Sequence, residues 1–387
     1  MDARINPYAP GAGTRPPLIA GRDSEIQAYE VLLDRLKRGT AGQSMIITGL
    51  CGVGKTVLLN ALEDISVERG WIAAGRELDE GTSFPVAIAR SAKRILNELR
   101  PTKRVAERIL QTFGRLGSFT LKDPSGFELS YTPDSEPSHE MLGEDFVDLL
   151  LALGQAAQSK SSGVAFLLDE VQFVPAKEFG PFVVGLHRLN QKALPVTCVA
   201  AGLPSLPALV GNAKSYAERL FEYPRIDQLT KPDALEALVS PASKLDVVWE
   251  PDALDYVFGQ TAGYPYFLQE YGKYAWDVAS HGRITKTDAR AGGRVAQDRL
   301  DHGFFKVRYE GRATKAERAF LHAMARCQGP PYAISEVTSA LGKSDQRSIS
   351  VRRNALIRKG LIYAPEHGMV DYTVPHFAAY LGRQDAE

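Results

Sequence analysis

The sequence predicts an α/β fold with a doubly wound parallel sheet, followed by a helical lid and a C-terminal winged-helix domain. From residue 44 to residue 202, short apolar runs alternate with amphipathic helical segments, which is the pattern of parallel strands connected by helices. The pattern becomes helical from residue 231, and the chain ends in three predicted helices followed by a hairpin. We therefore expect a leader at 1–17, a core at 18–230, a lid at 231–310 and a winged helix at 311–387.

The composition limits the classes of protein that fit. The chain has 387 residues, enough for two or three domains with a full core. Lys plus Arg equals Asp plus Glu at 46 each, so no global charge draws the chain to nucleic acid or to an anionic membrane, and any basic surface must be local. Three scattered cysteines favour neither a disulfide framework nor a metal site. With no signal peptide and no long apolar run, we expect a cytoplasmic protein without membrane contact.

The first predicted strand, residues 44–48, leads into a glycine-rich loop. The loop fits the P-loop pattern of a glycine, four residues and Gly-Lys-Ser/Thr, and a helical repeat follows it. In such a loop the backbone N–H groups and the helix N-terminus hold the phosphates of ATP, Lys55 reaches the β- and γ-phosphates, and Thr56 binds Mg²⁺. An ordinary glycine-rich turn would leave Lys55 and Thr56 unexplained. The predicted cofactor-binding residues here are Gly49, Leu50, Cys51, Gly52, Val53, Gly54, Lys55, Thr56 and Val57.

The segments around this loop complete the first half of the core. Residues 1–17 are rich in proline and glycine, which predicts an extended or disordered leader. Residues 71–74 predict a second strand, and residues 84–116 predict a long helix whose basic face we interpret as solvated rather than as a contact surface. Alternating apolar residues at 118–131 predict a hairpin, which must pack on the domain or on a partner because an isolated hairpin is only marginally stable.

A second decisive stretch is the apolar run at 164–168, which ends in Asp169 and Glu170. Such a run is typical of a central parallel strand that delivers carboxylates to its C-terminal edge. Asp169 would then hold Mg²⁺, and Glu170 would orient and deprotonate an attacking water. The alternative is a surface acid pair at the end of a core strand, but the preceding P-loop favours the functional interpretation.

The rest of the core and the lid continue this alternation. A helix is expected at 175–191, a buried strand at 195–202 and a further short strand near residue 223. The lid is predicted to consist of helices at 232–239, 251–261, 265–280 and 287–307.

The C-terminal domain begins with a predicted capping box formed by Thr314 and Glu317. Helices at 334–341 and 345–359 precede a hairpin at 361–374, and three helices followed by a hairpin form a winged helix. The third helix has a local excess of basic residues, and such a helix can enter a DNA major groove. A winged helix that binds protein is the alternative, and we favour DNA. The candidate DNA-binding residues are Arg347, Arg352, Arg353 and Arg358.

These pieces together resemble AAA+ ATPases of the initiator (origin-recognition) type and the neighbouring STAND signalling ATPases. The resemblance rests on the P-loop, on the Asp169-Glu170 pair and on the order of core, lid and winged helix, and it spans residues 18–381. It implies an α/β P-loop NTPase with a doubly wound parallel sheet, a helical lid and a C-terminal winged-helix domain.

Three residue roles follow from this resemblance and not from spacing. Ile19 and Arg22 would lie beside the adenine, and Pro265, in a Gly-Tyr-Pro lid motif, would pack on the nucleotide. Arg219 stands where such proteins place an arginine finger, so it joins Lys55 and Glu170 as a candidate catalytic residue.

The chain also departs from the family pattern. The strand at 195–202 offers no Asn, Ser or Thr at the first sensor position, unless Thr197 serves, and no arginine lies near the start of the lid helix after Gly263. We therefore expect slow, Mg²⁺-dependent ATP hydrolysis and a nucleotide-set switch rather than a motor.

Three functions compete at this point. The first is a DNA-associated ATPase in which bound ATP sets domain orientation or oligomerisation. The second is a STAND-like signalling ATPase whose winged helix is a protein-interaction or regulatory module. The third, a metabolic P-loop kinase, is disfavoured by the winged helix and by the lack of an obvious site for a phosphate acceptor. The expected partners are therefore double-stranded DNA, a protein, or further copies of the chain.

Overall fold

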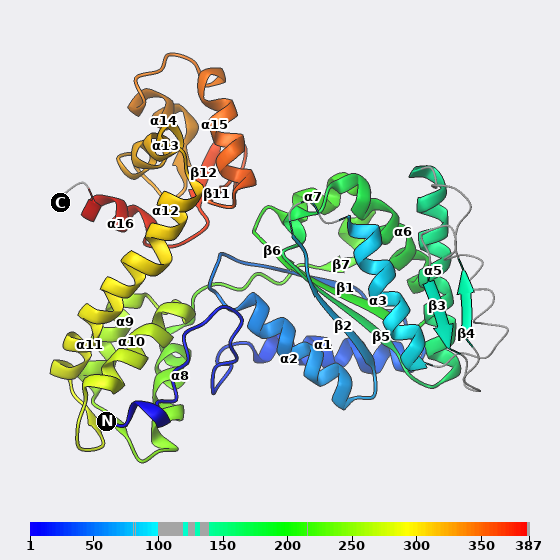
Figure 1. Ribbon diagram of the computed structural model, residues 1–387, viewed down its shortest axis with the longest axis horizontal. Coiled ribbons are helices and arrows are strands. Elements are labelled where there is room, and N and C mark those ends of the chain that lie inside the picture. The colour runs from blue at the N-terminus through cyan, green and yellow to red at the C-terminus, as the bar shows by residue number, and fades with distance from the viewer. Residues whose placement is uncertain are drawn as a thin grey trace.

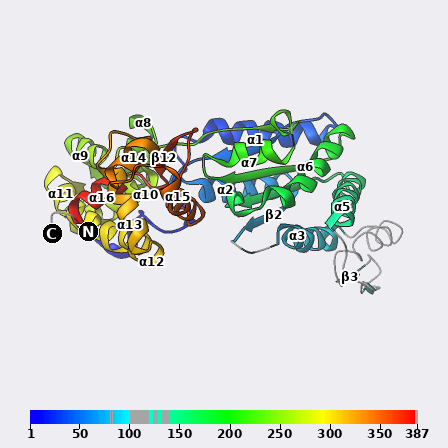
Figure 2. The same ribbon diagram turned by 90° about the horizontal axis from the view of Figure 1, so that it is seen from above.

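The computed structural model describes residues 1–79, 81, 83–99, 119–122, 128–131, 139–214 and 216–384. The described residues form two lobes (Figure 1). One lobe contains the large sheet and its helices. The other contains a helical module (residues 231–312) and, above it in Figure 1, a C-terminal module (residues 313–384). The same two lobes lie side by side when the molecule is seen from above (Figure 2).

The large sheet is parallel and has five strands in the order β2-β5-β6-β1-β7. Because the strands are parallel, their carboxyl ends meet at one edge, where ligands bind in open α/β sheets. All residues of β1, β5 and β6 are buried, as expected for strands that helices cover on both faces. The strands are β1 (Ser44–Thr48), β2 (Ile72–Glu77), β5 (Val164–Asp169), β6 (Val196–Gly202) and β7 (Phe221–Glu222).

Alternate residues of each central strand belong to two separate cores. Ile47, Leu167 and Val199 face the core that α1 (Asp23–Lys37) and α2 (Lys55–Glu68) cover. Their neighbours face a second core, which is rich in phenylalanine. The helices over this second face are α3 (Phe84–Leu99), α5 (His139–Ser159), α6 (Ala176–Gln191) and α7 (Leu206–Ala213). The sheet is therefore covered on both faces, which gives the expected α/β layers.

The helical module contains the helices that the sequence predicts, and two of them are longer than expected: the first, expected at 232–239, runs to Ser243. Its last helix, expected at 287–307, is one continuous helical run through residue 312, and six of its residues are π-helical. This run leads directly into the C-terminal module (Figure 1). The elements are α8 (Lys231–Ser243), α9 (Pro251–Thr261), α10 (Pro265–Val278), α11 (Lys286–Arg299), η4 (Leu300–Phe305), α12 (Lys306–Arg312) and a parallel pair of β8 (Val248–Trp249) and β9 (Arg283–Ile284).

In its described residues the C-terminal module has four helices and a small sheet in the order β10-β12-β11. The capping box predicted for Thr314 and Glu317 is confirmed, since each side chain bonds the backbone N–H of the other. A last helix, α16, was not predicted, and an Arg383–Asp301 ion pair joins it to η4. The elements are α13 (Lys315–Ala325), β10 (Tyr332–Ala333), α14 (Ile334–Ala340), α15 (Arg347–Arg358), β11 (Ile362–Tyr363), β12 (Met369–Tyr372) and α16 (Phe377–Gln384).

The N-terminal segment (residues 1–17) packs against the helical module. Apart from a short 3₁₀ turn, η1 (Ala3–Ile5), it has no regular structure. Its anchor is Tyr8, which is 3% exposed: the hydroxyl donates to the carbonyl oxygen of Leu238 and accepts from Trp249 Nε1 at 2.7 Å. Asn6 Nδ2 also donates to Asp277 Oδ1 at 2.8 Å. The segment therefore has a fixed path although its sequence predicts no helix or strand.

Two expected elements lie partly outside the described residues. The helix expected at 84–116 is described only as α3, and its remainder lies outside. The expected hairpin is present as the antiparallel pair β3 (Phe119–Lys122) and β4 (Glu128–Tyr131), whose connecting turn also lies outside. Within the part of the chain that the structure covers, no helix is long and apolar enough to cross a membrane.

Candidate nucleotide-binding site

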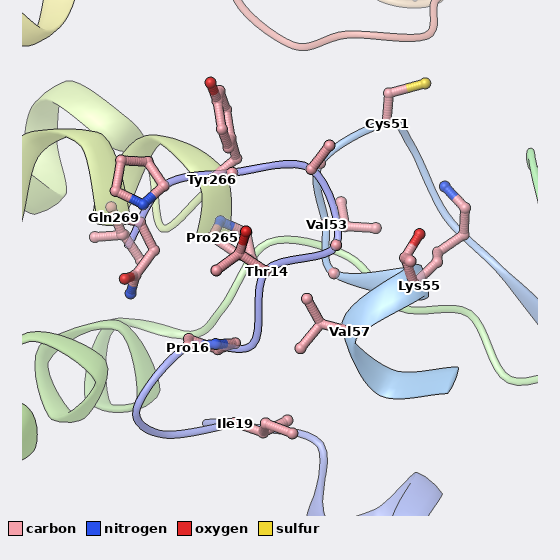
Figure 3. A pocket seen from close by; sticks show the side chains of 18 of the residues that line it. Thr14, Pro16, Ile19, Cys51, Val53, Lys55, Val57, Pro265, Tyr266 and Gln269 are labelled. Atoms are coloured by element: carbon pink, nitrogen blue, oxygen red, sulfur yellow. The ribbon is translucent and has the colours of Figure 1, made fainter. Parts of the chain in front are cut away.

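A cavity of about 500 Å³ lies between the two lobes at the carboxyl edge of the sheet. Figure 3 shows one wall formed by the loop after β1 and the start of α2, with α10 opposite. The N-terminal segment passes between them at Thr14 and Pro16. The side chains labelled on the two facing walls are Cys51, Val53, Lys55, Val57, Pro265, Tyr266 and Gln269.

The loop at 49–54 has a backbone that requires glycine at several positions. Gly52 and Gly54 have φ values of 90° and 98°, which L side chains rarely adopt. A Cβ at Gly49 would lie 2.5 Å from the carbonyl oxygen of Ile226. Helix α2 begins directly after Gly54, so its unpaired N–H groups face the cavity. This local geometry supplies an anion site of the kind that the sequence predicts.

Lys55 is 6% exposed and lies along the inside of the loop. Its Nζ donates to the carbonyl oxygens of Gly49 and Leu50, both at 2.9 Å. Gly49 and Leu50 therefore contribute carbonyl groups, while the later loop residues, from Cys51 onward, line the cavity. The described residues place no carboxylate against Lys55, so its charge is available for an anion in the cavity.

The two predicted metal ligands are in direct contact. Thr56 Oγ1 donates to Asp169 Oδ2 at 2.5 Å, although 113 residues separate them in the sequence. The other carboxylate oxygen of Asp169 accepts from the backbone N–H of Glu170 at 2.9 Å. A hydroxyl and a carboxylate are oxygen donors of the kind that Mg²⁺ prefers, and phosphates and water complete its shell. These residues therefore fit the predicted ion.

Glu170 lines the cavity beside this pair, as the base assignment requires. It has a positive φ of 56°, which is uncommon for a residue other than glycine, and it begins the short 3₁₀ turn η2 (Val171–Phe173). Glu77 of the neighbouring strand also lines the cavity. Burial raises the pKa of Glu77, and the charges of Asp169 and Glu170 add to that effect.

The remaining predicted nucleotide contacts are distributed around the same cavity. Ile19, Val57 and Pro265 line it, as does Arg22. Arg22 is 8% exposed, and burial lowers its pKa. Its guanidinium donates to the carbonyl oxygens of Val53 at 3.2 Å and Asp227 at 2.6 Å. Arg22 therefore links the loop at 49–54 to the segment after β7 through these two hydrogen bonds.

Other predicted residues lie elsewhere in the chain. Arg219 is exposed in the turn η3 (Ala217–Arg219), where its carbonyl oxygen accepts from Gln43, and it does not line the cavity. Thr197 lies near the start of β6 with its hydroxyl 3.3 Å from that of Ser44, so it is far from the carboxyl edge where a sensor would act. The four arginines of α15 lie outside the cavity, and α15 itself is on the side of the C-terminal module nearest the sheet lobe (Figures 1 and 2).

Arg308 of α12 is a cavity residue that the sequence did not reveal. Its guanidinium lies over the ring of Phe304, 3.9 Å from the centroid, and donates to the carbonyl oxygen of Phe304 at 2.9 Å. Burial lowers its pKa, and among the described residues no carboxylate forms an ion pair with it. No spacing rule relates residue 308 to a loop at residue 52, so the sequence held no signal for this contact.

The loop also contacts both modules of the other lobe. The hydroxyl of Tyr264 donates to the carbonyl oxygen of Cys51, and the Tyr266 N–H donates to that of Gly52 at 3.3 Å. The Cys51 N–H itself donates to the carbonyl oxygen of Thr373, just after β12, at 3.0 Å. The C-terminal module is thus bonded to the loop that is predicted to hold phosphate.

Comparison with known proteins places this geometry in a family. A family model described as an AAA ATPase domain matches residues 19–212, and one described as a domain of unknown function (DUF8462) matches residues 302–381. A Walker-type ATPase of Pyrococcus abyssi has a similar structure, with 15% sequence identity and a TM-score of 0.58 over 97% of this chain and 99% of that one. Cdc6p from Pyrobaculum aerophilum has 14% identity and a TM-score of 0.50 over 100% and 99%.

At such identities the structural matches support the fold alone. None of the curated proteins that were compared matches the chain. The AAA model, however, covers half of the chain and includes the loop, the Asp169-Glu170 pair and most of the sheet. The chain therefore belongs to the AAA ATPase domain family.

Proposed function

We propose that the chain is a nucleotide-dependent switch that binds ATP with Mg²⁺ in this cavity, hydrolyses it slowly and associates with DNA through its C-terminal module. The observation that carries the proposal is the contact of Thr56 with Asp169, 2.5 Å apart at the edge of the sheet and next to Lys55 on α2. A hydroxyl, a carboxylate and a lysine at the start of a helix form the set that binds a metal–triphosphate complex.

The phosphates would lie on the backbone N–H groups of residues 52–56 and on the N-terminus of α2. Lys55 would leave the carbonyl oxygens of Gly49 and Leu50 and move to the β- and γ-phosphates. Thr56 and Asp169 would hold the Mg²⁺, which neutralises the charge that develops on the phosphates.

Glu170 would take the proton of the attacking water. Arg308 would contact the terminal phosphate, because a half-buried guanidinium without an acid partner among the described residues gains from binding an anion. It would thereby provide the cation that the start of α10 lacks. The loop at 49–54 is already bonded to Tyr264 and Thr373. These bonds must rearrange before catalysis, which supports slow hydrolysis.

The DNA part of the proposal depends on α15 as the third helix of a winged helix. Arg347 and Arg358 are exposed at its two ends, and Val351 between them is 75% exposed. An exposed basic helix of this kind can bind phosphates and base edges in a major groove.

One contact favours the STAND-like alternative. The bond from the Cys51 N–H to the carbonyl oxygen of Thr373 makes the C-terminal module a direct neighbour of the nucleotide loop. A module in that place can act as a regulatory clamp whose partner is a protein.

Two variants test the nucleotide site. Glu170→Gln should keep ATP binding and stop hydrolysis, because the amide cannot accept the proton. Asp169→Asn should weaken Mg²⁺-dependent binding much more than binding without the metal. Equilibrium binding of ATP and phosphate release measure both, and Asp148→Asn on α5 is a matched control away from the cavity. Normal hydrolysis by Glu170→Gln would show that the base is assigned wrongly.

A further inference from the structure

Gln172 lies two residues after the proposed base and bonds to two different elements. Its Nε2 donates to Glu170 Oε2, and its Oε1 accepts from the backbone N–H of Leu203 at 3.2 Å. Leu203 follows the last residue of β6, so this side chain connects the carboxylate to the neighbouring strand.

The orientation of the Gln172 amide is fixed by its partners. The Leu203 N–H can only donate, so the amide oxygen must face the end of β6. The NH₂ group is then left to face Glu170, which accepts. An amide turned the other way would place two donors against each other on one side and two acceptors on the other.

Gly202 makes room for this arrangement. A Cβ at Gly202 would lie 2.5 Å from Gln172 Oε1 and 3.0 Å from Leu206 Cδ2. The end of β6, Ala200-Ala201-Gly202, has no polar side chain of its own at the cavity edge. The amide of Gln172 therefore occupies the place above the strand end where a polar residue is otherwise missing.

We propose that Gln172 is a positioning residue that holds the Glu170 carboxylate for proton transfer. The proposal rests on the proposed function of Glu170 as the base. With Oε2 held by the amide, Oε1 is left to accept the proton of the water. In that step the water oxygen bonds to the terminal phosphorus, the bond from that phosphorus to the bridging oxygen breaks, and ADP leaves.

Gln172→Met tests the proposal, because methionine keeps the length of the side chain and loses both hydrogen bonds. We expect kcat for ATP hydrolysis to fall about 10- to 100-fold, with KM and the Kd for ADP within about twofold of the parent, since only the base is misplaced. Gln155→Met, an exposed position on α5, is the matched control and should hydrolyse normally. Wild-type kcat in Gln172→Met overturns the proposal.

Gln172→Glu keeps the test valid if methionine disturbs the fold. Glutamate retains an acceptor for the Leu203 N–H, so the hydrogen bond at the end of β6 is kept. It replaces the donor to Glu170 with a second acceptor. We expect slow hydrolysis with normal ADP binding from this variant as well. Normal kcat here would show that the donor is unimportant and would overturn the proposal.

A double variant separates this proposal from the assignment of the base. If Gln172 acts only through Glu170, then Glu170→Gln/Gln172→Met should have the same residual rate as Glu170→Gln alone. A further tenfold loss would mean that Gln172 acts on something else and would overturn the proposal. An inactive Glu170→Gln together with a normal Gln172→Met refutes the role of Gln172 alone, whereas an active Glu170→Gln refutes the base itself.

Discussion

The two facing walls of the cavity are built in different ways. The core wall is the loop after β1 with the first turn of α2, residues 51–57, completed by Glu170 and the Asp169 that Thr56 contacts, both at the end of β5 in the same sheet. The opposite wall combines residues 9–14 and Pro16, the start of α10 and Arg308, which are far apart in the sequence. A loop between a strand and a helix is determined largely by its own sequence, whereas the second wall exists only because distant segments pack together. The chemistry should therefore depend mostly on the first wall and the regulation mostly on the second.

Lys55→Ala tests the core wall and should have the largest effect. Removing the ammonium deletes charge-assisted hydrogen bonds to the phosphates, so the Kd for ATP should rise about 100-fold or more. Isothermal titration with ATP and Mg²⁺ measures the change. Lys37→Ala, at the exposed end of α1, is the control and should bind as the parent does. An unchanged Kd in Lys55→Ala would mean that the core wall is not the phosphate site.

Tyr8→Phe tests whether the N-terminal segment is a fixed part of the second wall. The change leaves the carbonyl oxygen of Leu238 and the Nε1 of Trp249 without their buried partner. Unfolding free energy should fall by about 1–3 kcal/mol, as expected for buried groups that lose their hydrogen bonds. Urea unfolding followed by tryptophan fluorescence measures it.

The control for this change is Tyr274→Phe, because the hydroxyl of Tyr274 has no hydrogen-bond partner in the described part of the chain. Equal stability of the two variants would show that the segment is not docked in solution. A lower affinity for ADP in Tyr8→Phe would show that the docked N-terminal segment also contributes to nucleotide binding.

The contrast between the walls also explains what the sequence could and could not predict. The Thr56–Asp169 contact was predictable, because a P-loop and an apolar strand ending in acids lead to the same sheet edge. The capping box at Thr314 was predictable for the same local reason. Arg308 and Tyr8 were not, since their places depend on which helices pack against which. A proline- and glycine-rich segment such as 1–17 has no periodicity that would indicate its burial.

Arg308→Ala tests the second wall with a smaller expected effect. If the guanidinium contacts the terminal phosphate, the Kd for ATP should rise about tenfold while that for ADP changes less than about threefold. Arg308→Lys should recover only part of the loss, because an ammonium does not stack on the Phe304 ring as a guanidinium does. Competition titrations give the ratio of the Kd values for ATP and ADP. Arg294→Ala, at an exposed position on α11, is the control. Equal losses for both nucleotides would place Arg308 away from the terminal phosphate.

Arg352→Ala/Arg353→Ala tests α15, which belongs to neither wall, and each arginine should have a modest effect. If α15 binds DNA phosphates, the slope of log K against log salt for a duplex should become about two units less steep. Fluorescence anisotropy across a salt series measures the slope. Arg290→Ala/Arg294→Ala removes the same charge from α11 and should leave it unchanged.

The dependence of this binding on ATP distinguishes the two proposed functions. In the structure, α15 lies on the side of its module nearest the sheet lobe, and the same module is bonded to the loop through Thr373 and Cys51. A γ-phosphate that displaces this bond would free the module, so ATP should strengthen duplex binding more than ADP does. Binding that is absent with both nucleotides would favour the regulatory clamp, because the arginines of α15 would then have no DNA phosphates to neutralise. If duplex affinity depends on salt but is equal with ATP and ADP, then α15 binds DNA, but the nucleotide does not control that binding through the second wall.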